Sequence, residues 1–246
     1  QVDFVEIDPA TGLMSVAALE RKLEQAASSG TLPKILVPVH LCGTSCDMAA
    51  IGALAQRYGV AVLEDASHAI GGHYQGEPVG NCRHSAISVF SFHPVKIITT
   101  AEGGLATTND PELAQRMADL RSHGITKDEA RFERPAPGPW SYEQQELGFN
   151  YRLTDLQAAL GLSQLERLEA IVSERQRLLE IYRERLASLP ISLLKIPSNV
   201  TSALHLAVIR LHEVNPEYHR RVFEGLRSAG IGVQLHYSPV HLQPYY

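Results

Sequence analysis

The sequence lacks the features that mark several classes of protein. No apolar run approaches the ~18 residues that cross a membrane, so no transmembrane segment is predicted. Lys and Arg number 22 against 27 Asp and Glu, and a net charge of −5 does not suit a nucleic-acid binder. Only three cysteines are present, an odd number that argues against a secreted disulfide framework and favours a reducing cytoplasm. The remaining composition, 44% hydrophobic and 20% charged, is typical of a soluble globular protein.

Both ends of the sequence also lack the features of a complete domain. The first residue is Gln1 and not Met, and residues 2–7 already resemble a strand, with no signal peptide before them. The last residue, Tyr246, follows a proline-rich stretch without a closing helix. We therefore expect a chain that is truncated at both ends.

Apolar β-rich runs alternate with helical patterns over the first half of the sequence. The expected strands and helices lie at 34–39 (strand), 48–58 (helix), 60–63, 86–90 and 104–108 (strands), and 111–121 (helix). Such alternation is typical of βαβ units around a largely parallel sheet. The predicted fold class is therefore α/β, doubly wound.

A different pattern follows this first half. Residues 124–148 are rich in proline and charge and predict a long loop of functional importance. From 154 to 189 apolar residues recur at helical spacing, which predicts a long helix, broken at most once, between two domains. A strand, a helix and a strand are expected after it, at 206–211, 216–229 and 232–235. We divide the chain into a partial large domain, 1–165, and a linking helix with a partial small α/β domain, 166–246.

Two ionisable residues follow expected strands. Asp65 comes just after the strand at 60–63, and Lys96 follows the strand at 86–90. Open parallel sheets bind ligands at the carboxyl ends of their strands, so both residues are expected at one edge. Desolvation there lowers the pKa of a lysine and makes it nucleophilic, and an aspartate can pair with a pyridinium nitrogen. The two residues suit pyridoxal phosphate (PLP) chemistry, although a surface lysine and a capping aspartate fit the same residues equally well.

The segments around these residues resemble a known family. The runs at 62–69 (VLEDASHA), 91–96 (SFHPVK) and 148–159 (GFNYRLTDLQAA) are similar to fold-type I PLP enzymes of the DegT/StrS nucleotide-sugar aminotransferase family. The similarity covers essentially all 246 residues. It implies a mostly parallel sheet of the seven-stranded type with helices on both faces, and a smaller C-terminal α/β domain. Within the family, residues 39–48 and 91–100 most resemble aminotransferases of the pseudaminic acid pathway, which aminate C4 of a UDP-linked 4-keto-6-deoxy-N-acetylhexosamine.

The resemblance implies roles for individual residues. Lys96 matches the lysine that forms a Schiff base with PLP and later moves protons, and Asp65 matches the partner of the pyridinium nitrogen. His68 would lie beside the phenolic oxygen of the cofactor, and Ser91 would bind its phosphate. Asn150 would reach the phosphate held by a neighbouring subunit, which implies a homodimer with shared active sites.

Other matching positions imply contacts with the substrate, and these are His93, Tyr151, Arg152, His236 and Tyr237. A structural role for His93 and a carboxylate partner for Arg152 stay open as alternatives. Some relatives have histidine in place of the lysine and dehydrate their substrate, so Lys96 favours transamination from L-glutamate to a UDP-linked keto-sugar. The phosphate loop and ring-stacking aromatic of the family are not found, and we expect them before Gln1.

Other functions fit parts of the sequence. His40, Cys42 and Cys46 suggest a metal site, but no second ligand pair accompanies them and Cys82 is isolated, so no metal is expected. A different UDP- or dTDP-linked keto-sugar is an alternative substrate. A noncatalytic PLP-binding regulator is a further alternative, although such a protein has no need of both Lys96 and Asp65.

Overall fold

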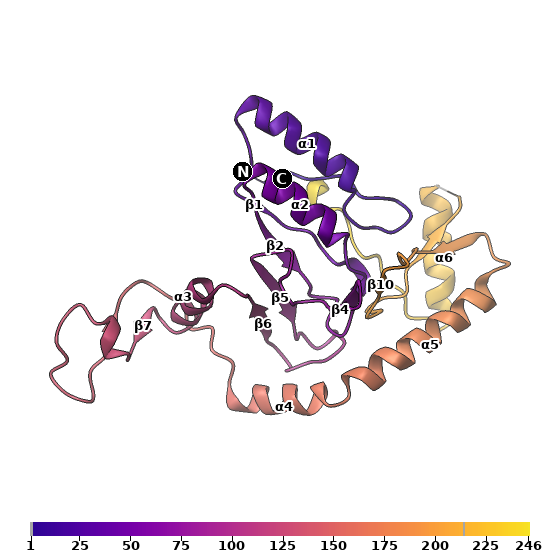
Figure 1. Ribbon diagram of the computed structural model, residues 1–246. Helices are drawn as coiled ribbons and strands as arrows, with labels where there is room; N and C mark the ends of the chain where they lie inside the picture. Colours follow the sequence, from indigo (N-terminus) through magenta and orange to yellow (C-terminus); the bar gives the residue numbers. More distant parts are fainter. Residues whose placement is uncertain (1, 214) are drawn as a thin grey trace.

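The computed structural model describes residues 2–213 and 215–246 (Figure 1). Its main sheet has the strand order β1-β2-β5-β6. The four strands are β1 (Ile35–Leu36), β2 (Ala61–Asp65), β5 (Ile87–Ser91) and β6 (Gly104–Thr107). The first three run parallel, and β6 pairs antiparallel with β5. Because Asp65 pairs with Val89, β2 and β5 end at the same edge of the sheet.

The largest core cluster involves two helices and the start of the sheet. The helices α1 (Val16–Ser29) and α2 (Met48–Tyr58) pack together, and Leu19 and Ile51 between them are almost completely buried. No element was predicted at α1. Two N-caps explain where these helices begin, because the side chain of Ser15 accepts the N–H of Ala18 and that of Asp47 accepts the N–H of Ala50.

Several predicted elements are confirmed and two are wrong. The helices expected at 48–58 and 111–121 are α2 and α3 (Pro111–Arg121). Residues 2–7 do not form a strand, since within residues 2–213 and 215–246 their only pairing is a single bridge between Ile7 and Met14. Residues 232–235 are also not a strand, because no segment that the structure describes pairs with their backbone.

The predicted long helix is broken once, as expected. It consists of α4 (Asp155–Leu165) and α5 (Leu168–Leu186), and Thr154 and Gln157 form a capping box at its start. In Figure 1, α4 and α5 follow one another below the main sheet, with a bend where the helix is broken. The α5 helix contacts the core through Val172, which packs against Ile97 and Ile98.

The C-terminal part does not have the βαβ pattern that was predicted. Its strands β9 (Ile191–Leu193) and β11 (Ile209–Leu211) pair antiparallel, and α6 (Pro216–Ser228) follows them. Of the predicted strand, helix and strand, β11 and α6 are present, but residues 232–235 form no strand in the described part of the chain, so the unit lacks its second strand. The division of the chain at residue 165 stays a prediction.

Short elements complete the fold. A three-stranded sheet joins β3 (His73–Tyr74), β4 (Glu77–Pro78) and β10 (Val200–Thr201), and this pairing brings the segment after α5 back to the first half of the chain. The long loop contains the hairpin β7 (Ile125–Thr126) and β8 (Glu143–Gln144). Single turns of 3-10 helix lie at η1 (Leu41–Gly43), η2 (Glu129–Arg131) and η3 (Val240–Leu242). Among the described residues, no helix combines the length and the apolar character needed to span a membrane.

Candidate active site

Asp65 is the last residue of β2, and its backbone is fixed on both sides. Its N–H donates to the carbonyl of Pro38 at 2.9 Å, and its carbonyl accepts the N–H of His40 at 3.0 Å. The carboxylate turns back on the chain, where Oδ1 accepts the N–H of Ser67 at 3.0 Å. In the described chain this is the only hydrogen bond to the carboxylate. Asp65 therefore presents a well-placed negative group with spare acceptor capacity at the sheet edge.

Lys96 lies in the loop that leaves β5, and two buried neighbours anchor that loop. Ile97 and Ile98 pack against α5, and the N–H of Lys96 donates to the carbonyl of His93 at 2.9 Å. Burial lowers the pKa of Lys96 below its ordinary value, while the charge of Asp65 acts in the opposite direction. The carboxylate of Asp65 is thus close enough to act on the charge of Lys96.

His68 follows β2 and is held as a neutral ring. Its Nδ1 accepts the N–H of Cys42 at 3.3 Å, so the single ring proton is on Nε2. Burial lowers the pKa of His68 to about 4, and the charge of Lys96 lowers it further, while Asp65 acts in the opposite direction. At neutral pH, His68 is therefore a hydrogen-bond donor through Nε2.

A second histidine that the sequence analysis did not single out lies against His68. The ring centroids of His68 and His205 are 4.4 Å apart. The N–H of His205 donates to the carbonyl of Cys42 at 2.9 Å, and Arg175 of α5 donates to the carbonyls of Leu204 (2.9 Å) and His205 (3.2 Å). The pKa of His205 is lowered to about 3, mainly by burial and further by the charges of His68 and Lys96. Its sequence context is a single histidine before an apolar run, which carries almost no functional signal.

Four of the other predicted residues lie on β5, the loop after it and the C-terminal segment, and the remaining three follow one another at 150–152. Ser91 ends β5, and its Oγ accepts the N–H of His93 at 3.4 Å, while His93 Nε2 lies 3.8 Å from Glu102 Oε1. The charge of His236 affects the pKa of both His68 and His205, so the C-terminal segment also approaches the site. Tyr237 is exposed, with its ring 4.7 Å from that of His236.

The segment with Asn150, Tyr151 and Arg152 has polar and aromatic contacts with other parts of the chain. Asn150 forms a bridge with Ser122, and the exposed ring of Tyr151 stacks on Phe149. Across residues 2–213 and 215–246, no hydrogen bond or ion pair links these three residues to Lys96 or Asp65. The nearby helix α4 nevertheless meets the lysine loop, because Gln157 Nε2 donates to the carbonyl of Glu102 at 2.9 Å.

Comparison with known proteins gives a consistent result. Residues 1–246 match the model of the DegT/DnrJ/EryC1/StrS aminotransferase family. The uncharacterized protein MJ1066 of Methanocaldococcus jannaschii is 35% identical over 245 residues, which are 99% of this chain and 61% of that protein.

Solved structures of aminotransferases are also similar to this chain, over part of their own length. Helicobacter pylori PseC, an aminotransferase involved in the biosynthesis of pseudoaminic acid, is 32% identical with a TM-score of 0.87, over 99% of this chain and 61% of that one. Spr1654 of Streptococcus pneumoniae in its PLP form is 27% identical with a TM-score of 0.82, over 98% of this chain and 62% of that one. The chain thus spans less than two thirds of the length of these proteins, and it has their fold throughout. By its sequence and its fold, the chain belongs to the DegT/DnrJ/EryC1/StrS aminotransferase family.

Proposed function

We propose that this protein is a PLP-dependent aminotransferase that acts on a nucleotide-linked keto-sugar. The observation that carries the proposal is the meeting of Lys96, Asp65 and His68 at one edge of the sheet, where burial lowers the pKa of the lysine. Membership of an aminotransferase family and the likeness to PseC support it. The three cysteines form no disulfide and are buried, which supports our expectation of a cytoplasmic enzyme.

The residues at this edge fit PLP. A lysine whose pKa is lowered by burial supplies a nucleophilic amine for the aldehyde carbon. The spare acceptor capacity of Asp65 suits a protonated pyridine nitrogen, and Nε2–H of His68 suits an oxygen acceptor. Ser91 offers a hydroxyl at the end of β5 for a phosphate oxygen. When bound, PLP supplies the electron sink that stabilises negative charge on the substrate carbon.

The chain's own residues then have distinct tasks. Lys96 binds the cofactor through Nζ and, when Nζ is free, takes and returns a proton. Asp65 keeps a proton on the pyridine nitrogen by its negative charge, and His68 orients the ring by donating from Nε2. We assign L-glutamate as the amino donor and C4 of a UDP-linked 4-keto-6-deoxy-N-acetylhexosamine as the acceptor. His93, Tyr151, Arg152, His236 and Tyr237 are our proposed substrate contacts, and the approach of His236 to the site supports its assignment.

The experiment that tests the cofactor site compares two lysines. The purified protein, expressed with any residues that flank this sequence in its gene, is expected to show a visible absorbance band with PLP. Lys96→Ala is expected to abolish the band, whereas Lys34→Ala, at an exposed position before β1, retains it. A band that persists in Lys96→Ala would contradict the assignment.

The substrate is tested separately. Wild-type protein with L-glutamate is assayed against a panel of UDP- and dTDP-linked keto-sugars. Amino transfer to the UDP-linked 4-keto-6-deoxy-N-acetylhexosamine is the expected preference, and preference for another sugar would replace that substrate while keeping the reaction. Bound PLP without transfer to any member of the panel would favour a regulatory protein.

We further propose that the working enzyme is a homodimer in which Asn150 reaches the partner's site. The supporting observation is an exposed apolar surface around α4, where Leu156 is 86% and Leu162 is 66% exposed, next to exposed Phe149 and Tyr151. Burying such a surface against a second copy would bring the Asn150 segment to the partner.

Light scattering after size exclusion tests the dimer. Leu156→Asp is expected to yield monomers, because an aspartate on this surface opposes its burial. Leu32→Asp, at another exposed leucine after α1, is the matched control and is expected to stay dimeric. A monomeric wild type, or a dimeric Leu156→Asp variant, would refute this part of the proposal.

A further inference from the structure

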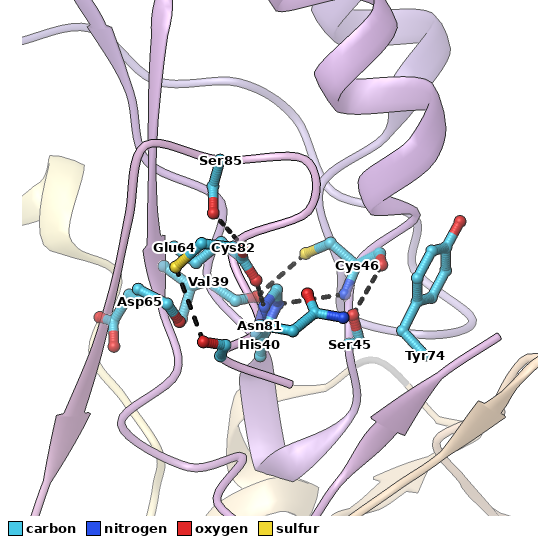
Figure 2. Close-up of polar contacts among 12 residues, drawn as sticks. Val39, His40, Ser45, Cys46, Glu64, Asp65, Tyr74, Asn81, Cys82 and Ser85 are labelled. Atoms are coloured by element: carbon cyan, nitrogen blue, oxygen red, sulfur yellow. Dashed lines mark hydrogen bonds and ion pairs between the residues drawn. The ribbon is translucent and has the colours of Figure 1, made fainter. Parts of the chain in front are cut away.

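A buried hydrogen-bonded group lies directly behind Asp65, and the proposed function does not use it. His40 Nε2 and Glu64 Oε2 are 2.7 Å apart, and the hydroxyl of Ser85 donates to the other carboxylate oxygen, Oε1 (Figure 2). Both His40 and Glu64 are buried. Successive residues of a strand point to opposite faces, so Glu64 faces this group while Asp65 points away from it, as Figure 2 shows.

The hydrogen bonds assign the protons of this group. The N–H of Cys46 donates to Nδ1 of His40 at 3.2 Å, so Nδ1 carries no proton and Nε2 donates to Glu64. Burial raises the pKa of Glu64, but hydrogen bonds from His40 and Ser85 lower it more, so that it lies below its ordinary value and Glu64 is ionised. Burial lowers the pKa of His40, while Cys46 and Glu64 raise it to about 9 and so favour a second proton on the ring. The Cys46 N–H already donates to Nδ1, however, and the ring therefore carries a single proton, on Nε2.

This group is one attachment of the loop that contacts His68, beside the bonds from the N–H groups of His205 and Ala203 to the carbonyls of Cys42 and Gly43. The loop of residues 40–46 is attached at one end by the backbone bond from His40 to Asp65 and at the other by the bond from Cys46 to the His40 ring. Between these ends, Cys42 adopts φ 58°, an unfavourable conformation for a residue with a side chain, which surrounding contacts must maintain. In this conformation, Cys42 directs its N–H at Nδ1 of His68.

We propose that His40, Glu64 and Ser85 form a positioning group that keeps His68 in the tautomer with its proton on Nε2. If the loop loosens, the Cys42 N–H leaves Nδ1, and the ring is free to carry its proton on either nitrogen. The tautomer with the proton on Nδ1 would present an acceptor where a donor is needed. The role of the tautomer towards PLP rests on the proposed function, whereas the tautomer itself is a property of the protein alone.

Three variants separate positioning from general stability. Glu64→Gln keeps the shape of the side chain, and its amide can accept from His40 and donate to Ser85, so it conserves the group. Glu64→Leu leaves His40 Nε2 and Ser85 without their partner. Tyr74→Phe is the control, because Tyr74 is also buried and its hydroxyl donates to Asp47 (2.6 Å) and accepts from the N–H of Ala49 (3.3 Å) and from Gln75 Nε2 (3.1 Å), and none of these partners belongs to the positioning group.

The measurement is long-range ¹⁵N NMR of the histidine rings at pH 7 without cofactor. We expect His68 to carry its proton on Nε2 in the wild type, in Glu64→Gln and in Tyr74→Phe, and to show a mixture of tautomers in Glu64→Leu. An unchanged tautomer in folded Glu64→Leu would overturn the inference, as would an equal change in Tyr74→Phe.

A milder variant covers the case in which Glu64→Leu does not fold. Ser85→Ala removes one hydrogen bond to Glu64, and amide hydrogen exchange of residues 41–46 is expected to rise about fivefold relative to Tyr74→Phe. Equal exchange in the two variants would overturn the inference.

The cofactor gives an independent readout. With PLP, Glu64→Leu is expected to bind about tenfold more weakly than the wild type, while Glu64→Gln and Tyr74→Phe bind normally. Failure of the wild type to bind PLP would contradict the proposed function, and the tautomer measurement would still decide the positioning role. Wild-type affinity in Glu64→Leu would overturn the proposed link between the group and the cofactor site.

Discussion

Gly43 lies where three segments of the candidate site meet, and its replacement by alanine provides a sharp test of this packing. The residue has φ 94°, and a Cβ atom added to it would lie 2.8 Å from the carbonyl oxygen of His68 and 2.8 Å from the nitrogen of Leu204. The nitrogen of His205 would be 3.1 Å away. All three are backbone atoms, which cannot rotate aside as the end of a side chain would. Gly43→Ala must therefore push the loop, His68 and the segment before β11 apart.

The size of the effect follows from two contributions. A residue with a side chain at a left-handed φ costs about 1–2 kcal/mol. Forcing an extra methyl group into a packed site costs about 1–3 kcal/mol more. We therefore expect Gly43→Ala to lower the free energy of unfolding by about 2–5 kcal/mol. Gly59→Ala isolates the first contribution, because Gly59 has φ 67° and no heavy atom within 4 Å of the added Cβ, and its expected loss is about 1–2 kcal/mol.

Urea denaturation followed by circular dichroism measures both losses. In a chain of this length each kcal/mol also shifts Tm by about 2–4 °C, which provides a second reading. Gly43→Ala is expected to lose clearly more stability than Gly59→Ala. Equal losses in the two variants would show that His68 and residues 204–205 do not approach Gly43 as closely as described, and the reasoning would fail.

Two further predictions concern a helix cap and a titration. Asp47→Ala removes the cap of α2 and the partner of the Tyr74 hydroxyl, and it should lower the free energy of unfolding, measured by urea denaturation, by about 1–2 kcal/mol. Asp110→Ala is the comparison, because the carboxylate of Asp110 only caps α3, and its loss should be smaller. A larger loss in Asp110→Ala would contradict this prediction. The pKa of His68 is about 4 in the folded chain, below the value of about 6.5 expected in the unfolded chain. As the pH falls below ~6.5, the unfolded chain therefore takes up a proton that the folded chain does not, and the stability that the neutral ring contributes above pH ~6.5 is lost as the pH approaches 4. The drop in Tm between pH 7 and pH 5 should be smaller in His68→Gln than in the wild type, and equal drops would argue against a buried neutral ring.

The elements that the sequence predicted well carry their own boundary signals. The bounds predicted for α2 and α3 are correct because Asp47 and Asp110 cap them, Pro111 fits a first turn, and Gly59 ends α2 in a left-handed conformation. Strands carry no such signals, since a strand exists only where a neighbour pairs with it. For this reason, the run at 34–39 pairs as β1 over Ile35–Leu36 with one further bridge at Val39, and residues 232–235 have no pairing partner among the described residues.

The sequence by itself determined the family, the α/β class and the candidate pair Asp65 and Lys96, because caps, periodicity and motifs act over a few neighbouring residues. Only the tertiary structure decided that His205 lies on His68 and that His40 pairs with Glu64 behind Asp65. These contacts join segments that are distant in the chain, and their chemistry comes from burial and proximity, which packing creates. A histidine in an unfolded segment has no fixed tautomer, whereas the packed loop of residues 40–46 gives His68 one.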